Sequence, residues 1–265
     1  MLLWSRTSKA IVLAVFAVLV AVVVVAPLAT VLLAAVAGRW TGALPSELTG
    51  EHLADAVNPD GMASLLVSVQ TALLAGIASV VIGTWAAVAA HDAPGPVRRL
   101  TLGLCHLPIA VPSVVVGLGL LIAFNRPPLL LGGTQWIVIL AHAVLVLAFT
   151  VSTVTAGLDR LDPAYEQAAR SLGASEARVL LRVRLPLLLP SLAAAAGLAV
   201  ALSMGELGAT IMVYPPSWRT LPVTLFTLSD RGDAFLASAS TVVLLVVTAL
   251  LLFALSRIRS RAALR

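Results

Sequence analysis

Long apolar blocks separated by short polar connections dominate the chain. An α-helix needs about 20 apolar residues to cross the roughly 30 Å of hydrocarbon in a bilayer. Six blocks approach or exceed that length: Ala10–Ala37, Ser64–Ala90, Leu100–Phe124, Trp136–Gly157, Leu187–Met204 and Phe235–Leu255. The pattern predicts an all-α polytopic membrane protein with about six transmembrane helices.

Composition supports a lipid-facing surface. Hydrophobic residues make up 60% of the 265 and charged residues only 11%, whereas soluble domains carry about a quarter charged residues. The first block is longer than the 7–15 residues of a signal-peptide core, so we expect an uncleaved helix. We therefore predict a single transmembrane domain over residues 10–255, between an N-terminal segment 1–9 and a basic tail 256–265.

Basic residues are divided unequally between the two predicted sides of the membrane. One side holds only Arg39, Arg126, Arg219 and Arg231, and the other holds the remainder of the 17 basic residues, including the tail arginines. Because cytoplasmic loops carry the excess of Lys and Arg, the richer side is predicted to be cytoplasmic. An even number of spans then places both termini there.

Helix-breaking residues mark three regions. Pro108, Pro112, Gly117 and Gly119 in the third block favour a kink and close helix packing. The fifth block contains or adjoins Pro186, Pro190, Gly197 and Gly205. The mostly uncharged stretch Gly208–Asp233 contains Pro215, Pro216 and Pro222, and we expect part of it to be re-entrant and to line a cavity, where irregular backbone is tolerated.

The polar stretch 158–186 predicts two helices joined by a sharp turn on the cytoplasmic side. Asp162 followed by Pro163 is typical of a helix start. Gly173 is placed to end that helix in a left-handed conformation, and Ser175 to cap a second helix. A proline at the end of the stretch, Pro186, is expected to mark the entry to the next span.

The first of these short helices has two distinct faces. Glu166 and Arg170 are spaced as an i, i+4 ion pair. A second face, flattened by alanines, suits either docking of another backbone or contact with lipid headgroups, and the residue types leave both open. Its members, by their i, i+3, i+4, i+7 spacing, are Tyr165, Ala168, Ala169 and Leu172.

These residues also carry a motif that resembles the membrane-spanning subunits of binding-protein-dependent ABC importers. Those subunits share a cytoplasmic EAA sequence, a glycine three residues later, and Ile-x-Leu-Pro after nine more. The corresponding residues are Gln167-Ala168-Ala169, Gly173 and Val183-Arg184-Leu185-Pro186. The departures are Gln167 in place of Glu and Val183 in place of Ile.

The resemblance implies that the segment is a coupling helix that docks on a separate ATPase. It also implies a second permease copy or a paralogue, an extracytoplasmic substrate-binding protein, and a place in the bacterial inner membrane. The coupling residues that it implies are Tyr165, Glu166, Gln167, Ala168, Ala169, Gly173, Leu185 and Pro186.

The chain lacks the residues that hydrolyse ATP. A phosphate-binding Walker loop needs Gly-Lys followed by Ser or Thr, and the single lysine, Lys9, follows Ser8. We therefore expect a transport subunit that is not an enzyme and holds no cofactor, with ATP bound by the partner subunit.

A second constellation follows the fifth block, in the sequence Gly205-Glu206-Leu207-Gly208-Ala209-Thr210. A carboxylate at membrane depth is costly and marks a functional site by default, although Glu206 in a hydrated interface is the plain alternative. We predict a translocation pathway with Glu206, Gly208, Thr210 and Arg219. Arg219 suits either steering of an anion on the outer side or anchoring at the interface.

The stretch from Met212 to Asp233 resembles permeases for 2-aminoethylphosphonate most and those for molybdate, sulfate and thiamine more distantly. The predicted function is therefore permease activity for a small solute such as a phosphonate, and the other three solutes remain alternatives. A self-contained secondary transporter would carry more midplane carboxylates.

Three other classes of site or protein lack support in the sequence. An intramembrane enzyme needs clustered catalytic groups, and the spans contain none. Cys105, His106 and His142 do not form a ligand set, so we expect no metal site and two hydrogen-bonded histidines. Nucleic-acid binding is disfavoured because the arginines lie at the ends of apolar blocks without interleaved aromatic residues; membrane lipid is the expected surroundings.

Overall fold

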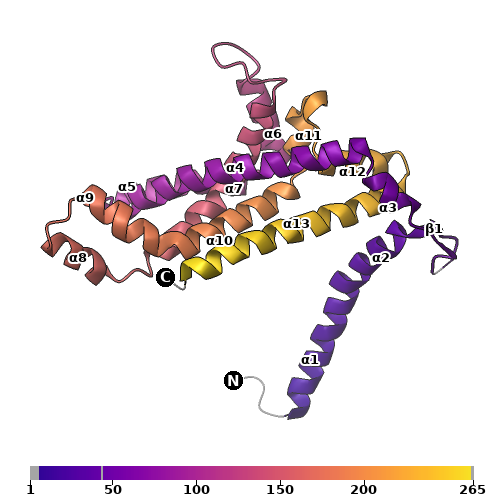
Figure 1. Cartoon of the computed structure of the whole chain (residues 1–265), viewed down its shortest axis with the longest axis horizontal. Coiled ribbons are helices and arrows are strands. Elements are labelled where there is room, and N and C mark those ends of the chain that lie inside the picture. The colour runs from indigo at the N-terminus through magenta and orange to yellow at the C-terminus, as the bar shows by residue number, and fades with distance from the viewer. Residues whose placement is uncertain (1–5, 43, 264–265) are drawn as a thin grey trace. The chain divides into compact units, whose positions relative to one another are not determined.

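Helices account for nearly all regular structure in the protein (Figure 1). The computed structural model describes residues 6–42 and 44–263, with side chains as far as Arg257. The predicted cytoplasmic ends at 1–5 and Arg265, and the side chains of Arg259 and Arg261, lie outside the described residues. Within the described ranges the strands are the short antiparallel pair β1 (Ala37–Arg39) and β2 (Glu47–Leu48). The all-α prediction is confirmed.

The number of candidate spans agrees with the prediction of about six. Five helical segments of the described chain are long and apolar enough to cross a membrane, and a bent helix pair makes a sixth when it is counted as one span. The five are Arg6–Ala35, Pro59–His91, Gln135–Leu158, Glu176–Met204 and Ala234–Arg257.

The third predicted span is not one continuous helix. Helix α5 (Gly95–Ala110) and helix α6 (Ser113–Ala123) meet at an angle of 106°. Val111 between them is extended, with φ −110° and ψ 131°, because Pro112 disfavours a helical conformation in the residue before it. The expected kink in the span Leu100–Phe124 is therefore present, as a full break between two helices.

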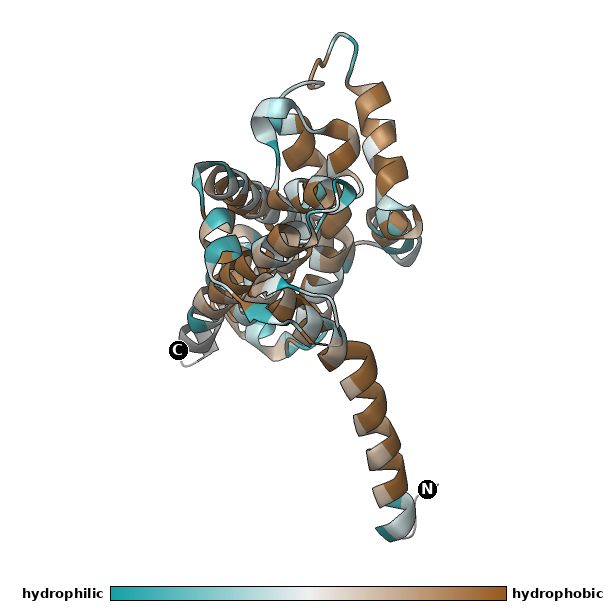
Figure 2. Cartoon of the chain, turned by 90° about the vertical axis from the view of Figure 1, so that its right-hand side faces the viewer, coloured by the Kyte–Doolittle hydropathy of each residue, from teal (hydrophilic) through white to brown (hydrophobic). Residues whose placement is uncertain are grey.

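The chain divides into two compact units, of which the first comprises residues 1–62 and 225–245. Its N-terminal helix runs through α1 (Arg6–Val20), the π-helical turn η1 (Ala21–Val25) and α2 (Ala26–Ala35). Figure 2 shows that this helix is hydrophobic over almost its whole length. Most of its apolar side chains are exposed in the described chain, as expected for a helix that faces lipid.

A small apolar core closes the first unit. It contains Ala35 of α2, Ala56 of α3 (Glu51–Ala56) and Ala239 of α13 (Ala234–Ala263). Leu53 and Leu236 pack against it.

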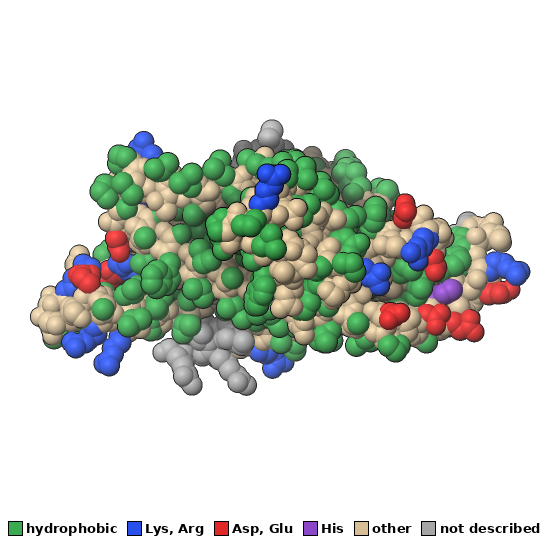
Figure 3. All heavy atoms as spheres, turned by 90° about the horizontal axis from the view of Figure 1, so that it is seen from above, with side chains coloured by type: hydrophobic (Ala, Val, Ile, Leu, Met, Phe, Trp, Pro, Cys, Tyr) green, Lys and Arg blue, Asp and Glu red, His purple; other side chains and the backbone are tan. Residues whose placement is uncertain are grey.

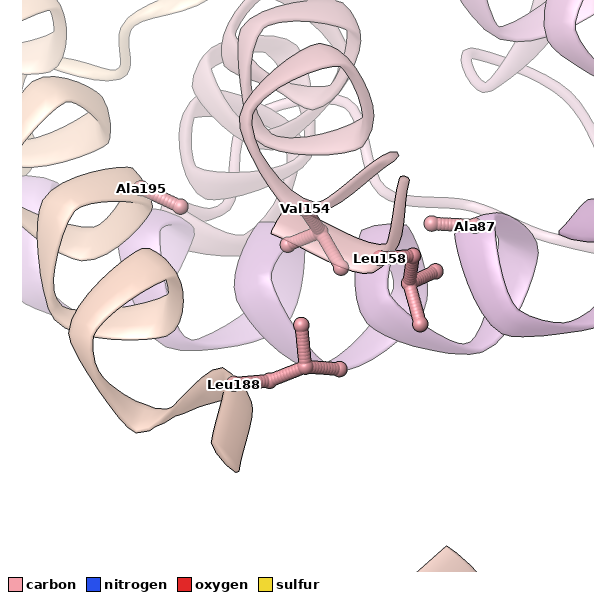
Figure 4. Packing of buried hydrophobic residues seen from close by; sticks show 5 residues of the cluster. All are labelled: Ala87, Val154, Leu158, Leu188 and Ala195. Atoms are coloured by element: carbon pink, nitrogen blue, oxygen red, sulfur yellow. The ribbon is translucent and has the colours of Figure 1, made fainter. Parts of the chain in front are cut away.

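The second unit comprises residues 63–224 and 246–265, and α7 (Gln135–Leu158) supplies much of its core. Figure 4 shows side chains of α4 (Pro59–His91), α7 and α10 (Leu185–Met204) that meet in one apolar cluster: Ala87, Val154, Leu158, Leu188 and Ala195. Glycines allow this close approach. A Cβ on Gly83 would lie 2.8 Å from a methyl of Thr150, and one on Gly157 would clash with Ser191.

The fifth span begins earlier than predicted. Helix α9 (Glu176–Val179), the π-helical turn η2 (Leu180–Arg184) and α10 follow one another without a break. Pro186 therefore lies inside a helix, and the prediction that it marks the entry to the fifth span is wrong. The reason is the wider π turn, in which Leu185 donates its N–H to Leu180, so that the helix accommodates a proline that lacks an N–H.

Short helical segments, rather than one long helix, connect α10 to α13. They are α11 (Thr210–Val213), the 3₁₀ turn η3 (Pro216–Trp218) and α12 (Leu221–Asp230). Gly232, with φ +80°, follows the last of them. Irregular backbone was expected here; its depth in a bilayer stays a prediction.

Candidate functional site

The predicted coupling helix is α8 (Pro163–Ser171), and its start and end have the predicted geometry. The Asp162 carboxylate accepts a hydrogen bond from the N–H of Ala164 at 2.9 Å. At the other end Gly173 has φ +79°. Its N–H donates to Arg170, and the next N–H, from Ala174, donates to Ala169, which is the pairing of a Schellman C-cap.

The face with the alanines is turned outward. Tyr165 is 58% exposed and Leu172 is 89% exposed. Ala168 and Gln167 are also exposed, and only Ala169 is half-buried. A surface helix normally buries its apolar side chains, so this arrangement leaves a flat, largely apolar surface available to another molecule.

The opposite, charged face of α8 is turned toward the protein. Arg184 donates from Nε to Glu166 Oε1 at 2.8 Å and from Nη2 to Oε2 at 2.9 Å. The same guanidinium donates from Nη1 to Asp92 Oδ2 at 2.7 Å. The Arg184 side chain is 7% exposed and that of Glu166 is 18% exposed. The hydrogen bonds from Arg184 lower the pKa of the Glu166 carboxyl, because they favour its charged form.

Further ion pairs continue from this cluster. Arg170 lies 3.6 Å from Glu166, as its i, i+4 spacing predicts, and 3.0 Å from Glu176. Ser175 occupies the position before α9, but its hydroxyl makes no capping hydrogen bond. The prediction of a Ser175 cap is therefore wrong; the Arg170–Glu176 ion pair joins the two helices across this turn instead.

A neighbouring ion cluster lies at the adjacent helix ends. Arg98 of α5 donates to Asp159 at 3.1 Å, and His91 at the end of α4 lies 3.7 Å from the same carboxylate. In Figure 3, basic and acidic side chains gather over α8 and α9, on the left of the view. Arg184 and Asp92 were not predicted as site residues. The sequence feature that could have indicated Arg184 is its position as an arginine directly before an apolar span.

The two motif residues that follow Arg184 are not among the residues that form these ion pairs. Leu185 is half-buried and Pro186 is exposed. Both belong to α10 rather than to α8, so the structure does not bring them to the exposed face of α8.

The second predicted site lies where two helix breaks meet. Gly117 of α6 packs directly on Ala209, since a Cβ there would lie 2.8 Å from its Cα. A Cβ on Gly208 would clash with the Ser113 hydroxyl. The breaks after α5 and after α10 are therefore in close contact, and glycine is required at both positions.

A cavity of about 220 Å³ opens beside this contact. Its polar lining comprises Ser113, His142, Ser203 and Glu206, among mostly apolar side chains. Glu206 Oε1 accepts the N–H of Ala209 at 2.7 Å, so the carboxylate also stabilises the turn into α11. Arg219 is exposed and is not part of the lining. The structure thus brings Glu206, Gly208 and Thr210 together and leaves Arg219 apart.

His142 joins the two sides of the break after α10. Its Nδ1 lies 2.6 Å from the Ser203 hydroxyl and its Nε2 lies 2.7 Å from the Thr210 hydroxyl. The Thr210 hydroxyl donates to the Glu206 carbonyl, which favours the tautomer with the proton on Nε2 and with Ser203 donating to Nδ1. His106 is likewise hydrogen-bonded, to Leu102 and Ser152. Both histidine predictions are confirmed, although the clamping position of His142 was not foreseen.

The segment after α11 is fixed to one polar stripe of α4. Ser64, Ser68 and Thr71 of that stripe accept hydrogen bonds, at 3.1, 2.7 and 2.9 Å, from the side chain of Thr224, the backbone of Leu221 and the indole of Trp218. Arg219 therefore projects from a segment that is anchored on both sides.

Known proteins of similar sequence and fold support the resemblance found in the motif. The family described as "Binding-protein-dependent transport system inner membrane component" matches residues 79–263. A relative from Salmonella typhimurium, PhnV, named as a 2-aminoethylphosphonate transport system permease protein, is 43% identical over 98% of both chains. The molybdenum transport system permease protein ModB of Escherichia coli is 34% identical over 62% of this chain and 78% of its own.

Solved structures show the same fold at low sequence identity. A bacterial ABC transporter that imports alginate has a TM-score of 0.73 at 15% identity, covering 96% of this chain and 94% of its own. The MetNI methionine ABC transporter has a TM-score of 0.65 at 19% identity, covering 78% and 99%. Because the family match extends over more than half of the sequence, the chain belongs to the inner membrane components of binding-protein-dependent transport systems.

Proposed function

We propose that this permease carries a small phosphonate, such as 2-aminoethylphosphonate, across the bacterial inner membrane. The observation that carries the proposal is the 43% identity to PhnV over almost the entire length of both chains. The molybdenum and sulfate permeases are less similar and match over a smaller share of this chain. A phosphonate is therefore the leading substrate class, and molybdate, sulfate and thiamine are alternatives.

A separate ATPase subunit supplies the energy in this proposal. The exposed face of α8, with Tyr165 and Leu172 at its two ends, supports a docking role, because such a surface buries apolar area when a partner covers it. ATP then binds to the partner, since this chain has no Gly-Lys-Ser/Thr sequence. The coupling residues are those of the motif, Tyr165 to Ala169, with Gly173, Leu185 and Pro186.

The complete transporter contains further subunits. Six helices of one chain seldom enclose a polar path, so a second permease copy or a paralogue forms the other half. An extracytoplasmic binding protein delivers the solute, as the family description implies. Both termini lie in the cytoplasm, which follows the distribution of basic residues.

The translocation path in this proposal passes the cavity beside the two helix breaks. Glu206 is the charged group of its lining, and a carboxylate in such a position favours a pathway-facing role. Gly208 and Thr210 shape the turn next to it. Arg219, on the anchored segment that follows, attracts an anionic solute toward the outer opening.

Growth on 2-aminoethylphosphonate as the only phosphorus source tests the substrate. A strain that lacks this gene is expected to grow on inorganic phosphate but not on the phosphonate, and the gene in trans should restore growth. Molybdate-dependent and sulfate-dependent growth should be unaffected. Normal growth on the phosphonate, or a requirement for molybdate or sulfate supplements, would assign the permease to another solute.

A further inference from the structure

The orientation of α8 depends on ion pairs rather than on apolar packing. Within the described chain, none of the residues of α8 is fully buried, and its exposed face carries Tyr165 and Leu172. A short helix without buried side chains is marginally stable by itself. The contacts that fix it to the rest of the protein are therefore the side-chain bonds of Glu166 and Arg170.

Arg184 is the group to which most of these bonds lead. Its guanidinium holds both carboxylate oxygens of Glu166 and one oxygen of Asp92, at 2.7–2.9 Å. A planar guanidinium that binds a carboxylate with two parallel bonds fixes direction as well as distance. A lysine provides the charge without this geometry.

The three residues come from three separate elements. Glu166 belongs to α8, Arg184 is the last residue of η2 before α10, and Asp92 directly follows α4. Next to Asp92, His91 faces the Asp159–Arg98 pair, which joins α7 to α5. The end of α4 is thus the meeting point of the two ion clusters, and α8 is tied through Arg184 to two membrane helices at once.

We infer that Arg184 is a positioning residue that holds the docking helix rigidly against α4 and α10, so that movement of the ATPase on α8 becomes movement of those helices. The inference rests on the proposed ATPase partner. Without Arg184 the ATPase still binds the exposed face of α8. Movement of α8 is then no longer transmitted to α4 and α10. Loss of Arg184 is therefore expected to separate ATP hydrolysis from transport.

Proteoliposomes that contain the complete transporter and its binding protein provide the first test. For Arg184→Met we expect solute uptake to fall about tenfold or more, a typical size for an energetic coupling between sites, while ATP hydrolysis falls less than about twofold. The ratio of ATP hydrolysed to solute imported therefore rises. Uptake and hydrolysis that fall in parallel, or remain unchanged, would overturn the inference.

Arg182→Met is the matched control. Arg182 lies in the same π turn, is exposed, and forms no ion pair with the described residues. It should leave the ratio unchanged. Arg184→Lys, which keeps the charge but not the two parallel bonds, should be intermediate. If Arg184→Met does not assemble, Asp92→Asn provides the second test, because it removes the charged partner of Arg184 next to α4 and leaves the Glu166 bonds in place.

Hydrogen exchange in the purified complex tests the inference without any knowledge of the solute. Amides of α8 should exchange about tenfold faster in Arg184→Met than in the wild type or in Arg182→Met, as expected for local opening. Equal exchange in all three would contradict the positioning role. Failure of the wild-type complex to import a phosphonate would instead count against the proposed function and leave this comparison intact.

Discussion

Glu166 shows how one residue can have a role that its motif does not indicate. It precedes Gln167, which occupies the position of the acidic motif residue, yet its carboxylate faces inward and binds Arg184. The outward positions of α8 are consequently uncharged at Tyr165, Gln167 and Ala168. The carboxylate of Glu166 thus attaches α8 to the protein, and the uncharged residues form the surface that we propose for docking.

The Glu166–Arg184 pair predicts a pH dependence of α8. The pKa of Glu166 is lowered in the folded protein by the hydrogen bonds from Arg184. The pair therefore stabilises α8 fully above the ordinary glutamate pKa of 4.5, and this contribution is lost as the pH falls through the lower folded value. Exchange protection of α8, corrected for the intrinsic rate, should be constant at neutral pH and decline only in acid. Glu166→Gln should make the decline smaller, since the carboxylates of Asp162 and Glu176 still bond α8; a decline near pH 7 would contradict the prediction.

Replacement of Gly173 is expected to cost free energy of folding because of its backbone conformation alone. A Cβ at this position meets no atom within 4 Å, but the residue has φ +79°. Gly173→Ala should destabilise the turn by about 1–2 kcal/mol, the usual cost of a left-handed conformation, and Gly173→Asn should cost less. Co-purification of the ATPase measures the effect. Gly95→Ala, also in open space but without a positive φ, is the control, and equal losses in both variants would refute this explanation.

Glu206 offers a substitution that removes charge and keeps geometry. Its Oε1 accepts the Ala209 N–H, and the amide oxygen of glutamine accepts the same bond. Glu206→Gln should therefore assemble normally with its partners, while the rate of solute uptake falls by about tenfold, equivalent to about 1.4 kcal/mol. Uptake at the wild-type rate would remove Glu206 from the pathway.

At the scale of elements, two helices contain a π-helical turn just before a proline. In the first span the turn Ala21–Val25 precedes Pro27, and in the fifth span the turn Leu180–Arg184 precedes Pro186. The wider turn relieves the clash of the proline ring with the carbonyl four residues earlier. The same turn ends at Arg184, so the helix irregularity and the position of the guanidinium have one origin.

The break after α10 depends on His142. Ser203 has no side-chain partner other than His142 among the described residues, whereas Thr210 also bonds to the Glu206 carbonyl. His142→Ala should destabilise the protein by about 1–3 kcal/mol, because it leaves the buried Ser203 hydroxyl unpaired. Thermal unfolding in detergent measures this.

The control for that substitution is His106→Ala. Its partner Ser152 keeps a second hydrogen bond, to Ala148, so the loss should be smaller. A larger loss of stability in His106→Ala than in His142→Ala would show that the hydrogen bonds of His142 to Ser203 and Thr210 are not important for the break.

For the molecule as a whole, most of the spans and the pair of short helices α8 and α9 could be predicted from the sequence. Length and apolarity suffice to find a membrane helix. The ends of α8 could be predicted because the preferences of Asp162, Pro163 and Gly173 for helix ends depend only on the local sequence. The 106° break at Pro112 could not be predicted, since a proline indicates a break but not its angle. The continuous helix through Pro186 depends on a π turn that has no sequence signature.

Contacts between distant residues escaped prediction for a different reason. Asp92 and Arg184 are 92 positions apart, and the partners of His142 are separated from it by 61 and 68 positions. Such pairs follow from the packing of α4, α7 and α10, which periodicity alone does not give. The candidate site was therefore predicted at its motif residues, and its buried partners were found only in the structure.

We propose that this chain moves a phosphonate only when a separate ATPase drives it. The most direct measurement is uptake of labelled 2-aminoethylphosphonate into proteoliposomes that contain the permease, the ATPase and the binding protein. We expect uptake that requires ATP and all three components and that stops when the ATPase is omitted. Uptake by the permease alone under an ion gradient, or no uptake with ATP and every component present, would contradict the claim.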